Sequence, residues 1–429
     1  MGWTNVLFVI AVSAGVALFV RNVRTLSRAI LTGRSIGAID SKKERFLRML
    51  RLAFGQQKMQ RNLVVGVLHF VVYLGFLIIN IELIEILIDG VFGTHRSLSF
   101  LGSLYNIAIA TFEWFALGVI AAVLVFGIRR NVLAIARFRS AEMKGWPKLD
   151  ANLILLIEVV LMALFLTMNA ADYALQLRGN EHYPRVGHFP VSSMLTPWFA
   201  SWSNASIILL ERVTWWAHIL GILGFLNYLY YSKHLHILLA FPNTYYASLA
   251  PKGKFESNPA ITKEVKAMMT MEASDPNQVI ERFGAKDVGD LTWLQLMNAY
   301  SCTECGRCTA ACPANQTGKL LSPRKIMMDT RDRSEALIRH PNDLKVKEQT
   351  LLDHYISREE LWACTSCNAC VEACPVEINP LSIILKMREY LVLEEASAPS
   401  DLNAMMANIE NNGAPWAFNA QDRMNWINE

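Results

Sequence analysis

The chain has 429 residues, of which 53% are hydrophobic and 18% are charged. An average soluble protein has about 45–50% apolar and about 25% charged residues, so the composition argues against a wholly soluble protein and excludes a disordered or purely fibrous one. The net charge of +4 is too small to indicate a nucleic-acid partner.

Five apolar stretches precede residue 240 and are long enough to cross a membrane. They cover residues 3–20, 63–81, 106–128, 152–175 and 213–231. Each can cross the hydrocarbon layer, which is about 30 Å thick, as a helix of about 20 residues. Buried helices of a soluble domain would carry polar faces, and none of these stretches shows one over its full length. The sequence therefore predicts an all-α membrane protein with a five-helix transmembrane bundle over residues 1–240.

The first stretch is expected to be a retained anchor, because Arg21, Arg24 and Arg28 follow its apolar run, whereas the charges of a signal peptide come first. Residues 21–61 and 129–150 together hold seventeen Lys and Arg, whereas residues 89–105 and 175–204 hold three. Loops rich in these residues stay in the cytoplasm. The expected location is the cytoplasmic (inner) membrane of a bacterium or archaeon, with the N-terminus outside and everything after the fifth span in the cytoplasm.

Three histidines on the second and fifth spans are candidate haem ligands. Eighteen residues, or five whole turns, separate His218 from His236. On one continuous helix the two would share a face about 27 Å apart, while His234 would face elsewhere. Imidazoles from two facing helices commonly hold haem b, so we expect His69 and His236 to bind one haem, with His69 and His218 as the alternative pair. Hydrogen-bonded core histidines are the other interpretation.

Carboxylates within the spans also have two interpretations. Glu82, Glu85 and Asp89 share one helical face near the expected outer end of the second span. One interpretation is a quinone pocket with a proton exit near the outer surface. The other is that these groups pair with one another or reach the interface. Further charged residues mark other spans, namely Glu113, Glu158, Asp172, Glu211 and Arg212.

All eight cysteines fall in two eleven-residue windows with the same spacing, C-x-x-C-x-x-C-x-x-x-C-P. Three thiolates on one tight loop cover three irons of a [4Fe–4S] cluster, and the fourth cysteine points toward the other cluster. One cluster should therefore bind Cys302, Cys305, Cys308 and Cys374, and the other Cys364, Cys367, Cys370 and Cys312. This pattern is not a secreted disulfide framework.

Zinc is the alternative for such C-x-x-C pairs, but it would leave the third cysteine and the Cys-Pro of each motif unexplained. The interval between the two motifs is too long for a minimal ferredoxin, and Ser322 followed by Pro323 resembles a helix cap and first helical position. We therefore expect a mainly helical cytoplasmic dicluster domain. The chain has no Gly-rich nucleotide fingerprint, phosphate loop or nucleophile elbow, which favours electron conduction over group transfer.

The runs "LHFVVYLGF" and "WWAHILGILGFLNYLYYSKHLHIL" resemble the cytochrome b subunit of respiratory nitrate reductase and the membrane subunit of methanogen heterodisulfide reductase. In nitrate reductase two histidines on each of these helices bind two haems. The resemblance implies that His69 and His236 match the ligands of the cytoplasmic-side haem and that His218 matches one ligand of the outer haem. The other outer ligand would fall near Ile79, so the resemblance does not supply a partner for His218.

Residues 295–390, with "CTECGRCTAACPANQTGKLLSPRKIM", resemble the small dicluster subunit of heterodisulfide reductase. The tail "IENNGAPWAFNAQDRMNW" looks like the segment that joins this domain to a cysteine-rich catalytic domain in longer fused relatives. The resemblance implies that a separate polypeptide docks near this tail. The expected domains are the bundle (1–240), a linker and helical connector (241–294), the dicluster domain (295–395) and a partner-docking tail (396–429).

These features predict a membrane-bound electron-transfer subunit. Quinone is expected to exchange electrons with haem b, and the two clusters to pass them to or from a cytoplasmic partner. That partner is either a cysteine-rich subunit that reduces a disulfide-like acceptor or a flavoprotein. The alternative is a redox sensor or scaffold that has iron–sulfur clusters and no haem. The direction of electron flow is open, because cluster potentials span roughly −700 to +450 mV.

Overall fold

The computed structural model describes residues 2–255, 257–270, 282–417 and 419–428. Within these residues the chain is helical and forms no strand, and its only strand-like contacts are two isolated bridges. It divides into two compact units. The first unit comprises Met1–Arg28, Asp40–Ala247 and Tyr300–Gly306, and the second comprises Ala29–Ile39, Ser248–Ala299 and Arg307–Glu429. The expectation of an all-α protein is confirmed.

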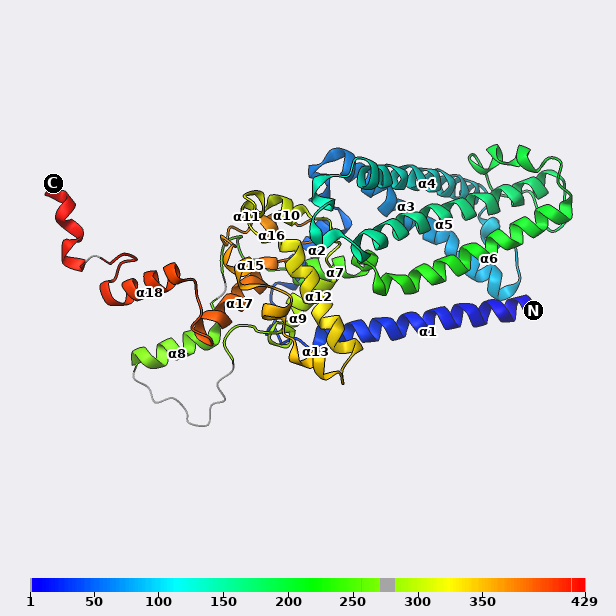
Figure 1. The fold of residues 1–429 in the computed structure, drawn as a ribbon. Helices are drawn as coiled ribbons and strands as arrows, with labels where there is room; N and C mark the ends of the chain where they lie inside the picture. Colours follow the sequence, from blue (N-terminus) through cyan, green and yellow to red (C-terminus); the bar gives the residue numbers. More distant parts are fainter. Residues whose placement is uncertain (1, 256, 271–281, 418, 429) are drawn as a thin grey trace. The chain divides into compact units, whose positions relative to one another are not determined.

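The first unit is a bundle of long helices (Figure 1). Its helices are α1 (Trp3–Leu31), α2 (Lys42–Met49), α3 (Leu63–Phe92), α4 (Ser103–Gly127), α5 (Trp146–Leu177), α6 (Asn204–Tyr228) and α7 (His236–Tyr246). Five helical segments of the described chain are long and apolar enough to cross a membrane, as the sequence predicted. Their bounds are Trp3–Leu31, Leu63–Phe92, Ser103–Val132, Trp146–Leu177 and Asn204–Tyr231. Each span is longer than its apolar run, because the helix continues into polar residues.

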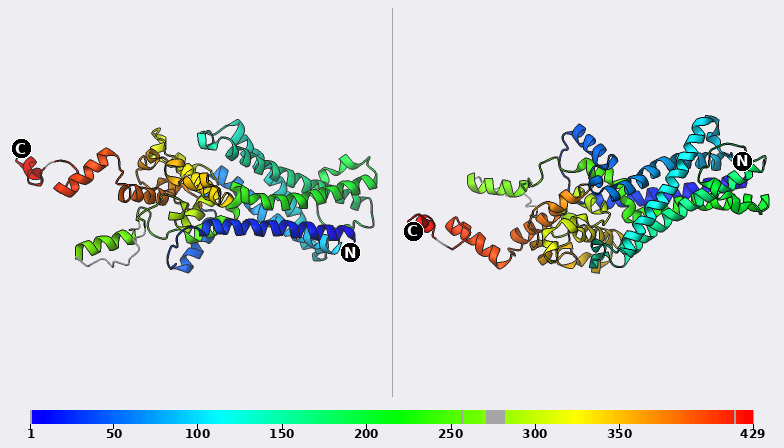
Figure 2. Two further views of the ribbon diagram at one scale, coloured as in Figure 1. Left: turned by 60° about the horizontal axis from the view of Figure 1, so that its bottom comes forward. Right: turned by 90° about the horizontal axis from the view of Figure 1, so that it is seen from above.

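The long helices pack in chain order, with α3 on α4, α4 on α5 and α5 on α6. They run alongside one another in both views of Figure 2. Local signals set their ends. Asn62 caps α3 by accepting a hydrogen bond from the Val65 amide at 3.3 Å, and Ser203 caps α6 in the same way. Gly93, in the left-handed region at φ 73°, ends α3, as is usual for a helix C-terminus.

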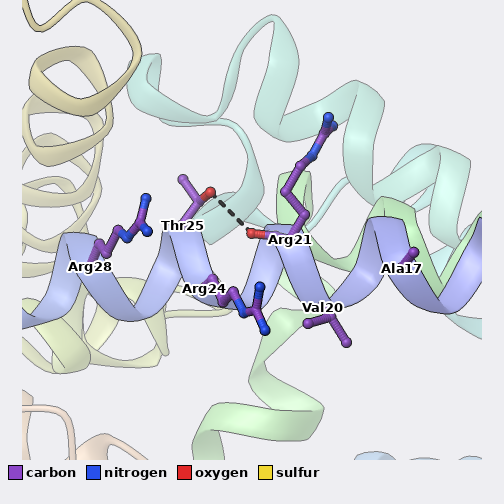
Figure 3. Close-up of a pocket in the computed structure, with 6 residues that line it drawn as sticks. All are labelled: Ala17, Val20, Arg21, Arg24, Thr25 and Arg28. Atoms are coloured by element: carbon purple, nitrogen blue, oxygen red, sulfur yellow. Dashed lines mark hydrogen bonds between the residues drawn. The ribbon is translucent and has the colours of Figure 1, made fainter.

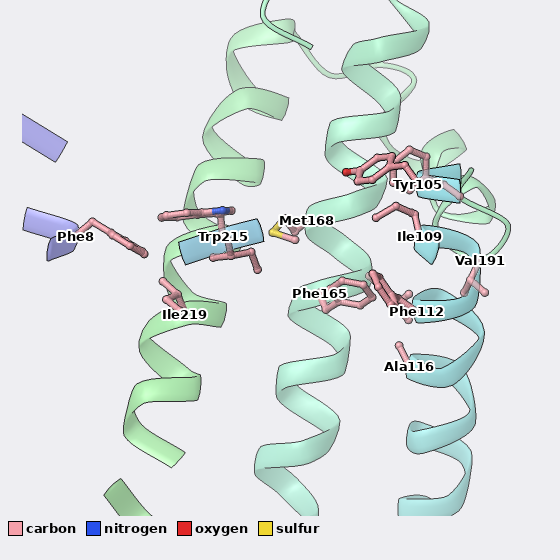
Figure 4. Close-up of a cluster of buried hydrophobic side chains, with 13 residues drawn as sticks. Phe8, Tyr105, Ile109, Phe112, Ala116, Phe165, Met168, Val191, Trp215 and Ile219 are labelled. Atoms are coloured by element: carbon pink, nitrogen blue, oxygen red, sulfur yellow. The ribbon is translucent and has the colours of Figure 1, made fainter. Parts of the chain in front are cut away.

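A cluster of aromatic and aliphatic side chains forms the core of the bundle (Figure 4). Phe112 of α4 and Phe165 of α5 face one another there, and both are buried. Helix α1 joins this core through Phe8, whose ring lies 5.3 Å from that of Trp215 on α6. Phe8 also packs directly against Gly90 of α3, where a Cβ atom would lie 2.4 Å from the Phe8 ring. The absence of a side chain at position 90 therefore allows α1 and α3 to approach.

Helix α1 carries an arginine-rich groove near its C-terminal end. Arg21, Arg24 and Arg28 line this groove of about 400 Å³ (Figure 3). Ala17, Val20 and Thr25 complete its lining. The spacing of the arginines places them on one side of the helix, directly after its apolar part. Cationic side chains in this position are typical of the end of a transmembrane helix at an anionic membrane surface.

The second unit is built of shorter helices. These are α8 (Pro259–Thr270), α9 (Trp293–Tyr300), α10 (Arg307–Ala311), α11 (Pro313–Gln316), α12 (Pro323–Arg339), α13 (Leu344–Glu348), α14 (Leu351–His354), α15 (Arg358–Trp362), α16 (Ala369–Ala373), α17 (Pro380–Leu393) and α18 (Ser400–Asn412). Helix α12 packs on α17, and α10 on α16. Ser322 caps α12 and Pro323 is its first residue, which confirms the predicted cap.

Residues after α1 also belong to the second unit. The Arg34 amide donates to the Leu291 carbonyl at 2.8 Å, and the Trp293 amide donates to the Arg34 carbonyl at 3.0 Å. The Arg34 guanidinium pairs with Asp290 at 3.1 Å. Inside the unit, buried Arg333 forms a two-point contact with Asp287 at 2.6 and 2.9 Å. A two-point contact of this kind compensates the charge of a buried guanidinium.

Candidate functional site

The two cysteine motifs fold into loops with the same backbone pattern. In the first motif Glu304 and Gly306 have left-handed φ angles of 55° and 72°. Ser366 and Asn368, at the same positions of the second motif, have φ angles of 56° and 62°. Residues in the left-handed backbone region turn successive amides toward the inside of a loop, as in anion-binding nests. The repeat seen in the sequence is therefore also a repeat in structure.

One inward amide in each loop donates to a cysteine sulfur. The Glu304 amide lies 3.4 Å from the Sγ of Cys302, and the Ser366 amide lies 3.4 Å from the Sγ of Cys364. The Ile378 amide donates to the Sγ of Cys374 at 3.3 Å. Hydrogen bonds to the sulfurs are one of the means by which proteins tune iron–sulfur clusters. The cysteine motifs do not predict these donors, because backbone amides leave no signal in a residue pattern.

The last cysteine of the first motif lies with the second motif. Burial, followed by the neighbouring thiols of Cys364, Cys312 and Cys367, raises the pKa of Cys370 to about 12. Burial also raises the pKa of Cys364, while the Ser366 amide lowers it. Buried thiols that repel one another ionise only beside a compensating cation. These four thiols therefore fit a shared cationic iron centre, and they are the set that the motif spacing predicts.

No three His, Cys, Asp or Glu side chains in the described ranges are grouped closely enough to hold a single metal ion. Tetrahedral zinc with Zn–S bonds of about 2.3 Å would draw its sulfurs to within about 4 Å of one another. A cluster of four irons accepts thiolates that are spread further apart, since each one binds a different iron.

His69 and His236 share a feature of metal-binding histidines. The Nδ1 of His69 on α3 lies 3.0 Å from the Oε1 of Gln56, and the Nδ1 of His236 lies 3.1 Å from the Lys233 carbonyl oxygen. Because each partner atom is an acceptor, Nδ1 carries the hydrogen and Nε2 presents its lone pair. Metal-ligating histidines usually make such an outer hydrogen bond. Both residues therefore fit a haem iron, and Gln56 is a participant that the sequence analysis missed.

The expectation that His218 and His236 share one continuous helix is wrong. Helix α6 ends at Tyr228, a 3-10 turn covers Leu229–Tyr231, and Ser232 is extended before a new turn leads into α7. Asp150 of α5 stabilises this break by accepting from the Tyr228 hydroxyl at 2.6 Å and from the Lys233 amide at 3.0 Å. His236 is therefore the first residue of a different helix, and the five-turn argument does not apply.

The break also changes the position of His234, which on a continuous helix would face away from His236. Its ring centroid lies 5.3 Å from that of His236, and it interacts electrostatically with both His236 and His69. Burial, followed by these two imidazoles, lowers the pKa of His234 to about 3, and Glu158 lies 3.6 Å away. The structure therefore brings His69, His234 and His236 into one group. His236, whose pKa burial also lowers, is neutral and suited to bind iron.

His218 lies in a different environment. It is 3% exposed on α6, its ring is 5.9 Å from Phe165, and its Nδ1 has no hydrogen-bond partner among the described residues. A buried, unsatisfied imidazole nitrogen is uncommon and often marks a functional role. Among the described residues, no hydrogen bond or ring contact joins His218 to the group around His236.

The carboxylates of the second span converge on one arginine. Arg96 follows α3, and its guanidinium contacts Asp172 at 2.8 Å, Glu82 at 3.2 Å and Asn169 at 2.6 Å. The Tyr105 hydroxyl donates to Glu85 at 2.9 Å. We call these six residues the Arg96 cluster. These carboxylates are thus paired through Arg96, a loop cation, whereas the expectation was that they pair with one another or reach the interface.

Comparison with known proteins identifies the cysteine-rich part of the chain. Residues 301–378 match the family model of a 4Fe-4S dicluster domain. A second model with the same description matches residues 266–317. This region therefore binds iron–sulfur clusters, as the two motifs predicted, and its function is electron transfer. No solved structure matches the chain.

Three relatives match between about a third and nearly all of the chain. The probable iron-sulfur-binding oxidoreductase FadF of Bacillus subtilis (strain 168) is 29% identical over 99% of this chain and 60% of its own length. The EtfAB:quinone oxidoreductase of Syntrophomonas wolfei is 25% identical over 91% of this chain and 55% of its own length. The probable membrane-anchored ferredoxin of Chromohalobacter salexigens is 31% identical over 36% of this chain and 26% of that protein.

Shorter matches are to heterodisulfide reductase subunits of Methanosarcina species. The chain spans little more than half the length of the two relatives that match nearly all of it. Together with the five apolar helices, the similarity to a membrane-anchored ferredoxin indicates a membrane protein that carries iron–sulfur clusters.

Proposed function

We propose that this protein is the membrane-bound subunit of a quinone-linked oxidoreductase. Electrons pass between the quinone pool, a b-type haem held by the helical bundle, and two [4Fe–4S] clusters that exchange them with a cytoplasmic partner. The observation that carries the proposal is the position of Cys312 beside Cys364 and Cys370, which fits two clusters that share their motifs crosswise. A pair of clusters bound in this way is suited to passing electrons between sites.

The proposed ligands follow from the motifs and the local geometry. Cys302, Cys305, Cys308 and Cys374 bind the first cluster, and Cys364, Cys367, Cys370 and Cys312 bind the second. His69 and His236 bind the haem through Nε2, with their Nδ1 atoms bonded to Gln56 and Lys233. His69 with His218 is the second choice for the pair. The haem supplies one-electron chemistry, while these residues orient it.

A flavoprotein is the better supported of the two candidate partners. The relative named EtfAB:quinone oxidoreductase aligns with 91% of this chain, whereas the heterodisulfide reductase matches cover at most about a third of it. Residues 396–429 are the proposed docking segment. Trp416 and Trp426 are 53% and 71% exposed there, and exposed aromatic side chains of this size are typical of binding surfaces.

The proposed orientation places the N-terminus outside and the clusters in the cytoplasm. It is supported by the excess of Lys and Arg in the loops after the first and third spans, including the arginine groove of α1. Protease protection in sealed vesicles checks this orientation independently of any cofactor.

A reduced-minus-oxidised visible spectrum of the purified full chain tests the proposed function. A b-type α-band that develops on anaerobic addition of a quinol is the expected result. A chain that retains its clusters but shows no such band would instead act as a haem-free sensor or scaffold. Copurification followed by mass spectrometry then distinguishes a flavoprotein partner from a cysteine-rich one.

A further inference from the structure

The Arg96 cluster holds more buried carboxylates than buried cations. Glu82, Glu85 and Asp172 are at most 2% exposed, and each lies within 4.0 Å of the Arg96 guanidinium. Glu113 is fully buried and joins the cluster through Asn169 at 3.3 Å. Burying several carboxylates around one cation costs far more free energy than protonating one of them. The charge balance therefore indicates that the cluster holds a proton.

Hydrogen-bond donors identify the carboxyl group that is least suited to be ionised. Three of the four carboxylates, Asp172, Glu85 and Glu113, accept hydrogen bonds on both of their oxygens. The donors are Arg96 and Gln176 for Asp172, the Leu98 amide and Tyr105 for Glu85, and Asn169 with the amides of Val191 and Ser192 for Glu113. Glu82 differs. Its Oε1 accepts from Arg96 at 3.2 Å, but its buried Oε2 has no hydrogen-bond partner among the described residues. A neutral carboxyl group tolerates such a site far better than a carboxylate does.

All other titratable and charged groups around Glu82 are fixed by the packing of four segments. They are Glu85 and Asp89 on α3, His95 and Arg96 in the following loop, Tyr105 and Glu113 on α4, and Asp172 on α5. Of these, His95 faces Asp172, at 3.4 Å, and not Glu82.

Glu82, Glu85 and Asp89 form a row along α3 toward its C-terminal end. They lie on one helical face and span about 10 Å along the axis. Glu82 and Glu85 are buried, whereas Asp89 is half-buried three residues before the helix ends at Phe92. Asp89 accepts hydrogen bonds from the Arg96 amide and the Thr94 hydroxyl, at 2.8 and 2.7 Å. The row leads from the interior of the bundle to the loop that follows α3.

We propose that Glu82 is a proton-binding site that exchanges protons between quinone and the aqueous phase beyond α3. This inference rests on the proposed function. Each one-electron step of quinol oxidation, with the ferric haem and the oxidised clusters as electron acceptors, breaks one quinol O–H bond. The Glu82 proton leaves through Glu85 and Asp89 to water, and the quinol proton replaces it. Each electron transferred is thus accompanied by one proton released to water, and Glu82 ends in its neutral form. During quinone reduction the same proton transfers run in the opposite direction.

Infrared spectroscopy of the full chain, oxidised and reduced, tests this site. The expected result at neutral pH is a C=O band of a protonated carboxylic acid that shifts to lower frequency in D2O. The band should be absent from Glu82→Gln, present in Glu82→Asp, and retained in Glu158→Gln, which removes a different carboxyl group within a span. Absence of the band from the unmodified protein, or its persistence in Glu82→Gln, overturns the proposal.

Kinetics distinguish this inference from the proposed function. Reduction by quinol should be slowed about 10²-fold in Glu82→Gln, the usual loss when a positioned proton-transfer group is removed. Reduction by dithionite, which supplies no quinol proton, should be unchanged in the same variant, which also shows that it folds and keeps its cofactors. Equal quinol rates in both proteins overturn the role of Glu82. If dithionite reveals no b-type haem, the proposed function fails, whereas the infrared band still decides whether Glu82 binds a proton.

Discussion

Lys233 and Glu304 form a buried ion pair within the first unit. Lys233 contributes its carbonyl to His236, and the Glu304 amide donates to the Cys302 sulfur. The side chains of Lys233 and Glu304 are 9% and 3% exposed. A short run of hydrogen bonds therefore connects a proposed haem ligand to a proposed cluster ligand, which fixes the first cysteine loop against the helical bundle.

Replacing Lys233 by Met should destabilise the protein, because it leaves the buried Glu304 carboxylate without its cation. Removal of one partner of a buried pair costs about 3–5 kcal/mol. The double variant Lys233→Met with Glu304→Met should recover at least half of this loss. Chemical unfolding in detergent, with the iron content of each variant, measures both effects.

Lys386→Met is the matched control. Lys386 pairs with Glu389 at 2.8 Å, but their side chains are 32% and 24% exposed, so the change should cost less than about 1 kcal/mol. Equal losses in the two lysine variants would show that burial of the Lys233 pair has no special effect.

Separate alanine substitutions of three histidines should distinguish the proposed haem pair from the alternative. His69→Ala and His236→Ala should each abolish the b-type spectrum, because each removes an axial nitrogen, while His218→Ala should retain it. Pyridine haemochrome analysis of the purified proteins measures the haem content. Loss of haem in His69→Ala and His218→Ala alone would select the alternative pair.

Gly90→Ala should separate α1 from α3. A Cβ atom at position 90 would lie 2.4 Å from the Phe8 ring, and overpacking of this kind costs about 1–3 kcal/mol. Gly224→Ala on α6 is the control, because no atom lies within 4 Å of its added Cβ. Thermal unfolding should show a lower midpoint for Gly90→Ala only, and Phe8→Leu should partly restore it. A Gly90→Ala protein as stable as Gly224→Ala would contradict the close packing.

The stability of the second unit should depend on Asp329. Burial raises the pKa of Asp329 to about 6, while Lys325 lowers it and Glu360 and Asp332 raise it. The folded state then binds the proton more tightly than the unfolded chain does. The stabilisation is complete below about pH 4 and is lost as the pH rises through 6, a change of about 3 kcal/mol.

Asp329→Asn should remove most of this decline between pH 4 and pH 6 in anaerobic chemical unfolding. Asp332→Asn is the control, since its side chain is 54% exposed. An unchanged pH profile in Asp329→Asn, or an equal change in both variants, would show that Asp329 is not the responsible group.

Local signals in the sequence were sufficient for several features. The apolar runs predicted the five spans, Ser322 and Pro323 predicted the start of α12, and the repeated cysteine motif predicted the 4Fe-4S dicluster domain. Each of these features depends on residues close together in the chain or on a repeated motif. Such signals can be recognised in the sequence without knowledge of how the helices pack.

The sequence did not predict the features that depend on residues far apart in the chain. The break at Ser232 depends on Asp150, which lies on another helix, so an unbroken fifth helix was the natural expectation. The Arg96 cluster draws residues from α3, α4, α5 and a loop, and the sequence showed only that Arg96 was a lone cation in a short loop. Tertiary contacts of this kind override local helical preference.

Chemical analysis of iron, acid-labile sulfide and zinc in the anaerobically purified full chain tests the central claim most directly. The two crosswise cysteine sets predict about eight non-haem irons and about eight sulfides per chain, and no stoichiometric zinc. Single Cys312→Ser and Cys374→Ser variants should each lose iron from the cluster of the opposite motif. Zinc in place of the iron would contradict the account.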